Sequence, residues 1–142
     1  MLEAGHSVSD EHRIALEDLE AGPEALRRLL ARKHKPTAIF AGNDDMAAAA
    51  VAVCHRQGLD VPSDITVVGF DDTAIATTIW PELTTVRQPI ADMSRAAVEL
   101  LVQQIRAQDC DEPAPIQHLV LEHQLVRRQS DAAPRIRPRL NP

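Results

Sequence analysis

Aromatic side chains are scarce in this 142-residue chain, which has no tyrosine and only Phe40, Phe70 and Trp80. A core must therefore be built from alanine, valine, isoleucine and leucine, a composition that suits helices packed on a parallel sheet. With 44% apolar and 25% charged residues, the chain has the composition of an ordinary folded protein, and its length predicts a single domain.

The chain also lacks an excess of basic charge, a paired-cysteine motif and a membrane-spanning segment. The 15 basic residues are outnumbered by 21 acidic ones, and the net charge of −6 argues against a surface that itself coats nucleic acid. Cys54 and Cys110 stand alone without C-x-x-C spacing, and neither a signal peptide nor a long apolar run occurs. We therefore expect a protein of the reducing cytoplasm that makes no membrane contact.

Turn, strand and helix signals alternate through the first half of the chain. They predict a helix from Gly22 and Pro23 to about Ala31, a strand over 37–41, a helix over 45–57 that Gly58 ends, and a strand within 61–70. Successive strand and helix units predict parallel strands with right-handed crossovers. The expected fold class is an α/β doubly wound, mainly parallel sheet.

The second half has a different plan. Residues 83–89 form a short extended piece, 90–107 the longest helical pattern, and 118–130 either a hairpin or one bent strand pair. Residues 131–142 hold three prolines and three arginines, which predicts a disordered basic tail. The opening residues look like the end of a helix, so we expect Met1 to be an internal methionine of a longer protein.

Polar residues follow both predicted strands, Asn43-Asp44 after the first and Asp71-Asp72 after the second. Carboxyl ends of neighbouring parallel strands meet at one rim, where open α/β sheets bind their ligands. An amide and a carboxylate there can each make two hydrogen bonds to the adjacent hydroxyls of a sugar. Asp44 and Asp72 also suit helix or turn capping, which leaves Asn43 and Asp71 as the candidates for ligand contact.

The hypothesis that the chain is an enzyme lacks most of the sequence motifs it would require. Paired aspartates such as Asp71 and Asp72 can hold Mg²⁺ for phosphoryl transfer, but no GxxxxGK[ST] stretch is present, and Lys33 and Lys35 follow no strand. No G-x-S-x-G elbow occurs, and the isolated serines are interpreted as cap or surface residues, namely Ser63, Ser94 and Ser130. We expect no catalytic residue and no cofactor.

The histidines give no metal-binding pattern. His118 and His123 would lie on opposite faces of a regular strand, and His55 has no second ligand four residues further along its helix. No metal site is therefore expected.

Four stretches stand in order between residues 22 and 130: PTAIFAGNDDMAAAAV, GLDVPSDITVVGFDD, PELTTVRQP and LVRRQS. Together they resemble the LacI/GalR family of bacterial transcriptional regulators. The resemblance implies a partial effector-binding and dimerisation domain over 1–130, with the fold of periplasmic sugar-binding proteins. Its expected parts are the C-terminal lobe (13–82), a crossover and return to the first lobe (83–115) and the last strands (116–130).

The resemblance also assigns effector contacts. Asn43 and Asp71 are similar to effector-binding positions of the family, as is Gln88, which could equally be a surface residue of the hinge strand. The family often stacks an aromatic ring on its ligand near the position of Glu17, so this chain departs from the pattern in favour of a more polar effector. The implied effector is a small sugar or polyol.

Dimer contacts are implied at the loop of Trp80 and at the helix that begins near Met46, with Ala48 and Val51 beside it. The alternative for Trp80 is a plug in the chain's own core. A homodimer or tetramer would then transmit effector binding to a DNA-binding helix-turn-helix that is absent from this sequence. The alternative hypothesis with the same fold is a periplasmic sugar-binding protein of a transport system.

Overall fold

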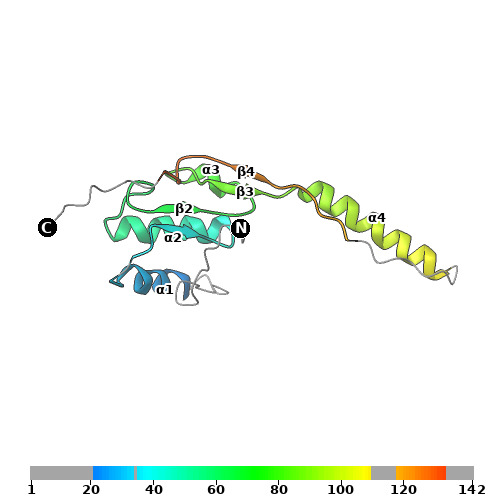
Figure 1. Cartoon of the computed structure of the whole chain (residues 1–142), viewed down its shortest axis with the longest axis horizontal. Coiled ribbons are helices and arrows are strands. Elements are labelled where there is room, and N and C mark those ends of the chain that lie inside the picture. Colours follow the sequence, from blue (N-terminus) through cyan, green and yellow to red (C-terminus); the bar gives the residue numbers. More distant parts are fainter. Residues whose placement is uncertain (1–20, 34, 110–117, 134–142) are drawn as a thin grey trace. The chain divides into compact units, whose positions relative to one another are not determined.

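The structure, a computed structural model, describes residues 21–33, 35–109 and 118–133. The elements along the chain are α1 (Ala21–Leu30), β1 (Ala38–Phe40), α2 (Asp44–Arg56), β2 (Thr66–Val68), α3 (Ile75–Thr78), β3 (Thr85–Arg87), α4 (Ile90–Asp109) and β4 (Gln124–Val126) (Figure 1). The chain divides into two compact units, one of Met1–Val86 with Leu125–Pro142 and one of Arg87–Gln124.

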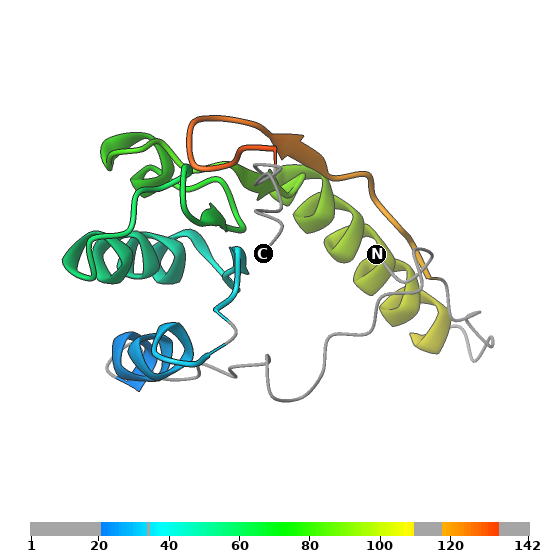
Figure 2. The same cartoon turned by 60° about the vertical axis from the view of Figure 1, so that its left-hand side comes forward.

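The first unit contains a parallel sheet. Strands β1 and β2 run parallel with Ile39 opposite Val67, and Val68 forms a further parallel bridge with Thr84. Helix α2 packs against both α1 and β2 and lies between them in Figure 1, and Figure 2 shows the same elements from another side. The parallel α/β class predicted from the alternation of strand and helix signals is therefore confirmed.

The core of this unit is aliphatic, as the scarcity of aromatic residues predicted. It brings together leucines of α1, small and branched residues of α2, residues of β2 and the segment before it, and single residues after β1, in α3 and before β3: Leu26, Leu29, Leu30, Ala41, Ala47, Ala50, Val51, Val53, Cys54, Val61, Ile65, Val67, Ala76 and Leu83. Burial raises the pKa of the Cys54 thiol to about 11, so this side chain acts as a small apolar residue of the core.

The end of α2 follows the predicted stop signal. Gly58 has a φ of +70°, and its N–H donates to the His55 carbonyl at 3.0 Å. The Leu59 N–H donates to the Cys54 carbonyl at 3.0 Å, which completes the two hydrogen bonds of a Schellman motif. A glycine is favoured here because other residues rarely adopt this left-handed conformation.

Several expected boundaries were wrong. Helix α1 begins at Ala21, so Gly22 and Pro23 lie inside its first turn rather than starting it. Among the described residues of the 118–130 stretch, only 124–126 form a strand, and the proposed hairpin is not seen there. The single turn of α3 was not predicted.

The start of the expected disordered tail is held to the first unit. Asp131 accepts hydrogen bonds from Thr84 and Arg127, and the Ala132 N–H donates to the Thr66 hydroxyl. The prediction of a disordered tail from residue 131 was therefore wrong for these two positions. Residues 134–142 lie outside the described part of the chain.

The second unit contains α4, a continuous helix two residues longer than predicted, and the segment 118–123 that precedes β4. The boundary between the units passes through β3 and β4, which pair with each other. None of the helices in the described ranges is both long and apolar enough to cross a membrane.

Candidate functional site

Two loops beyond the carboxyl ends of β1 and β2 carry the candidate ligand residues. Phe40 and Val68 are partners in the parallel register, and Asn43 and Asp71 each stand three residues further on. The Asp71 N–H donates to the Val86 carbonyl at 2.9 Å, which ties the second loop to β3 as well. The two candidates thus occupy equivalent places past neighbouring strands.

Asn43 is the N-cap of α2. Its backbone is extended, with φ −155° and ψ 173°, and its side-chain oxygen accepts a hydrogen bond from the Met46 N–H at 2.8 Å. The cap that sequence analysis assigned to Asp44 therefore belongs to Asn43. This contact uses the amide oxygen and does not involve the amide nitrogen.

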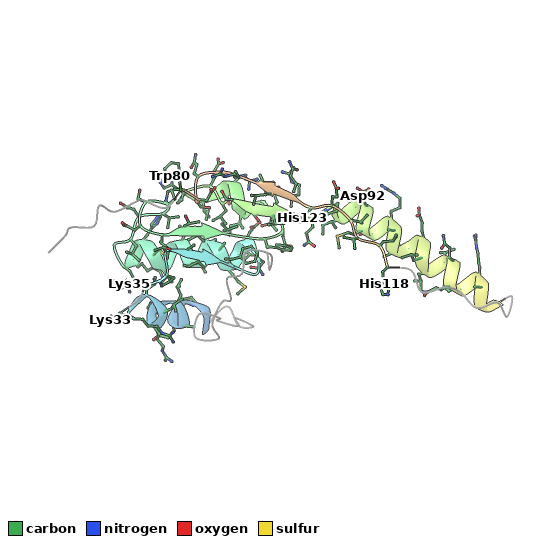
Figure 3. The ribbon with its side chains drawn as sticks, in the orientation of Figure 1. Lys33, Lys35, Trp80, Asp92, His118 and His123 are labelled. Carbon is green, nitrogen blue, oxygen red and sulfur yellow. The ribbon has the colours of Figure 1, made fainter. Side chains whose placement is uncertain are left out.

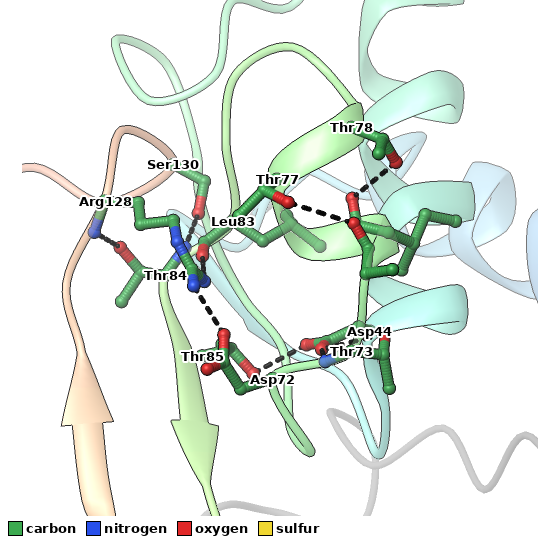
Figure 4. A network of polar contacts seen from close by, with 12 residues as sticks. Asp44, Asp72, Thr73, Thr77, Thr78, Leu83, Thr84, Thr85, Arg128 and Ser130 are labelled. Carbon is green, nitrogen blue, oxygen red and sulfur yellow. Dashed lines mark hydrogen bonds and ion pairs between the residues drawn. The ribbon is translucent and has the colours of Figure 1, made fainter.

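Asp44 connects the two loops from inside the unit. Its side chain is 0% exposed, and its carboxylate accepts hydrogen bonds from the Thr73 N–H at 2.7 Å, the Thr73 hydroxyl at 3.2 Å and the Thr85 hydroxyl at 2.6 Å (Figure 4). Since Thr73 follows Asp71 by two residues, the residue after one candidate is bonded directly to the loop of the other. The capping role predicted for Asp44 was wrong.

Gly69 makes room for this carboxylate. A Cβ placed on Gly69 would lie 2.2 Å from Asp44 Oδ1 and 3.3 Å from the Ala47 Cβ. The glycine at this position is therefore explained by close approach of the Asp44 side chain.

Asp72 forms a buried ion pair. The Arg128 guanidinium donates from Nη2 to Asp72 Oδ1 at 2.5 Å and from Nη1 to the Leu83 carbonyl at 2.7 Å, and the two side chains are only 13% and 6% exposed for arginine and aspartate. Figure 4 shows the guanidinium between Leu83 and Asp72. The Asp72 carboxylate is therefore engaged by a cation, a contact that the sequence did not predict, and its turn cap remains a prediction.

The turn of Asp71 and Asp72 has an unusual backbone. Asp71 has φ +101° and Asp72 has φ +58°, a left-handed region that residues other than glycine occupy uncommonly. Aspartate tolerates this region better than most residues, but the conformation still costs free energy that surrounding contacts must offset.

A second cluster of polar contacts surrounds Thr84. The Ser130 hydroxyl donates to the Val67 carbonyl and accepts from the Thr84 N–H at 2.9 Å, while the Thr84 hydroxyl accepts from the Arg128 N–H at 2.8 Å. Ser130 is buried, so its assignment as a cap or surface residue was wrong. The Arg127 guanidinium, together with the Thr84 hydroxyl, lowers the pKa of Asp131 below its usual value.

Gln88, the third predicted effector residue, belongs to the second unit. It is half-buried, and its carbonyl accepts from the Ile90 N–H at 2.9 Å at the start of α4. Its place relative to Asn43 and Asp71 remains a prediction.

The predicted dimer residues differ in exposure. The Trp80 ring is 73% exposed, so it is no plug of this unit's core (Figure 3). Met46 and Ala48 are half-buried on α2. Val51 is 3% exposed and packs in the unit's own core, so the prediction that it offers a surface to a second subunit was wrong.

The sequence did not predict the contacts that join these loops. It predicted only a capping role for Asp44 and no role for Arg128, Thr73, Thr84 or Thr85. In the described ranges, no group of three or more histidine, cysteine, aspartate or glutamate side chains could hold a metal ion.

A parallel sheet with hydrogen-bonding side chains at its carboxyl edge defines the class of open α/β ligand-binding domains. Residues 2–130 match the model of the periplasmic binding protein-like domain family. Relatives include catabolite control protein A of Priestia megaterium, 34% identical over 92% of this chain and 38% of the relative. Another is the HTH-type transcriptional regulator GalS of Salmonella typhimurium, 40% identical over 80% of this chain and 34% of the relative.

Among solved structures, a complex of the transcriptional regulator CelR with cellobiose is similar, with a TM-score of 0.76 and 35% identity over 89% of this chain and 38% of that one. The chain belongs to the periplasmic binding protein-like domain family, among its LacI/GalR regulators. It spans about a third of the length of the curated relatives it matches.

Proposed function

We propose that this chain is the effector-sensing and dimerisation portion of a LacI-type transcriptional regulator, and that it binds a small sugar or polyol between its lobes. The observation that carries the proposal is the equivalent placement of Asn43 and Asp71 beyond neighbouring parallel strands, in loops joined by Asp44. One supplies amide hydrogens and the other carboxylate oxygens, which together match adjacent hydroxyls. Gln88 is the proposed third contact, and the CelR complex with cellobiose supports a sugar as the ligand class.

Calorimetry on the full chain tests the ligand class. Cellobiose, D-glucose, D-galactose and sorbitol form the panel, with O-methylated cellobiose as the control because it lacks hydroxyl donors. Binding of at least one panel member, weakened by Asp71→Ala and absent for the methylated control, is expected. Equal binding by Asp71→Ala would contradict the proposed site.

The proposed regulator binds DNA through a helix-turn-helix outside this sequence and works by population shift, because an effector that prefers one lobe arrangement changes the fraction of chains in it. No covalent chemistry is needed. Reading the coding DNA in frame upstream of Met1 distinguishes the two rivals of this fold. A helix-turn-helix supports the regulator, whereas an export signal there would support a periplasmic transport protein.

A magnesium enzyme is disfavoured by the geometry of the aspartate pair. The Asp72 carboxylate is paired with Arg128 inside the unit, so it is poorly placed to join Asp71 as a second ligand of a hard cation. We propose no catalytic role for either residue.

Trp80 is the proposed centre of a dimer contact, with Met46 and Ala48 beside it. Burial of one such ring would contribute about 2 to 3 kcal/mol per subunit. Sedimentation of the full chain tests this, because Trp80→Ala is expected to shift the population toward monomer. An unchanged oligomeric state would place the interface elsewhere.

A further inference from the structure

Arg128 is a largely buried cation that takes no part in the proposed ligand contacts. Its guanidinium bridges the Asp72 carboxylate and the Leu83 carbonyl, and its own N–H donates to the Thr84 hydroxyl. Arg128 therefore connects the segment after β4 to the residues before β3 and to the turn after β2. All of these groups belong to the first unit.

The turn that Arg128 reaches holds two consecutive left-handed residues, Asp71 and Asp72. Such a pair persists only where surrounding contacts over-determine it. The contacts that act here include the Arg128 ion pair on Asp72, the hydrogen bond from the Asp71 N–H to Val86, and the hydrogen bond from the Thr73 N–H to Asp44. The ion pair acts on the residue directly after the candidate ligand.

We propose that Arg128 is a positioning residue of the effector site, which holds the Asp71-Asp72 turn in its left-handed conformation so that Asp71 faces the ligand. This inference rests on the proposed function, since it assigns Asp71 to effector binding. Without the guanidinium, the largely buried Asp72 carboxylate would lose the cation at its Oδ1, and the turn would relax toward conformations in which Asp72 reaches water. Effector affinity would fall with the fraction of chains that retain the competent turn.

Arg127 provides a matched control. It is the adjacent arginine on the same segment and pairs with Asp131, but its side chain is mostly exposed. Arg127→Gln therefore removes the same charge from the same segment while leaving the Asp72 pair intact.

Hydrogen exchange of the ligand-free full chain is the first measurement. Arg128→Gln is expected to accelerate exchange in the peptide over residues 69–75 by about tenfold or more, with little change in the peptide of α2. Arg127→Gln is expected to leave both peptides unchanged. Acceleration that is uniform over both peptides would indicate a purely structural role and overturn the proposal.

Sugar binding is the second measurement, with whichever of cellobiose, D-glucose, D-galactose and sorbitol binds the unaltered chain. Affinity is expected to fall about tenfold in Arg128→Gln if one turn in ten stays competent, and to stay constant in Arg127→Gln. The neutral pair Asp72→Asn with Arg128→Gln is expected to recover part of the loss, because no buried charge remains and asparagine accepts a positive φ.

Arg128→Lys decides the matter where Arg128→Gln does not fold. It keeps the charge but cannot serve Asp72 and Leu83 in the same forked geometry, so an intermediate acceleration in the turn is expected. The proposal is overturned if the folded variant matches Arg127→Gln in both exchange and affinity. If no panel sugar binds the unaltered chain, the proposed function fails, while the exchange data still decide whether Arg128 restrains the turn.

Discussion

The aspartate after β1, Asp44, is buried and accepts three hydrogen bonds from neutral donors. The aspartate after β2, Asp72, is instead paired with an arginine. In sequence the two loops look alike, since each has a polar candidate ligand followed by an aspartate. In the structure the first loop leads directly into a regular helix capped by Asn43, and the second passes through two left-handed residues. The same pattern of residues therefore has two physical solutions.

This difference follows from what each loop must connect. The first loop starts a long helix, whose free N–H groups take up the Asn43 oxygen and fix the backbone locally. The second loop precedes only the single turn of α3, whose N-cap, Ala74, makes no side-chain hydrogen bond. It therefore depends on a contact from a segment far along the chain.

The comparison is most severely tested by Asp44→Ala. The substitution leaves the buried hydroxyl of Thr85 and the part-buried donors of Thr73 without their acceptor, and a loss of about 3 kcal/mol in the free energy of unfolding is expected. Asp45→Ala, at the next and exposed position of α2, should cost about 0.5 kcal/mol. Urea unfolding of both variants measures the difference. Similar costs would mean that Asp44 does not join the loops.

Gly69→Ala is expected to have the next largest effect, about 2 kcal/mol, because the added methyl group would collide with the Asp44 carboxylate. Gly42→Ala is the matched control in the first loop, since its Cβ would meet only the Met46 sulfur at an ordinary 3.8 Å. Urea unfolding again gives the readout. A mild effect at Gly69 would show that Asp44 can shift, and that the first loop is held less firmly than the contacts indicate.

Much of the first loop's framework could be predicted from local sequence. The apolar runs before residues 43 and 71 marked β1 and β2, and Gly58 marked the end of α2, because these signals act over a few neighbouring residues. The rim position of Asn43 and Asp71 followed from the parallel arrangement alone. Val51 was misassigned because helical periodicity does not say which neighbour covers an apolar side chain.

The anchoring contacts could not be predicted in this way. Asn43 and Asp44 are both competent caps, and only the backbone geometry decides which one accepts the Met46 N–H. The Arg128 partner of Asp72 lies 56 residues away, so no local pattern joins them. Ser130 looked like a surface residue because its burial depends on β2 and on the residues before β3.

Substitutions at Asn43 separate its role as a helix cap from its proposed contact with the ligand. Asn43→Ser keeps a good cap and removes the amide, so stability should change by only a few tenths of a kcal/mol while sugar affinity falls about tenfold. Asn43→Ala should lose both, with about 1 kcal/mol of stability. Urea unfolding and calorimetry on the two variants give the two quantities. If Asn43→Ser binds sugar as the unaltered chain does, Asn43 is a cap alone.

The smallest expected effect is the pH dependence of the Arg127–Asp131 ion pair. The hydrogen bond from Arg127 is the main cause that lowers the pKa of Asp131 in the folded chain, so the unfolded chain binds this proton more readily. The stabilisation is therefore present above the ordinary aspartate pKa of 3.8 and is lost as the pH falls through the lower folded-state value. Asp131→Asn should be less stable than the unaltered chain at neutral pH, and the gap should close in acid. Chemical unfolding across this pH range measures the difference in the free energy of unfolding between the two proteins. A difference that stays constant down to the lowest pH would show that the Arg127 contact does not stabilise the segment after β4.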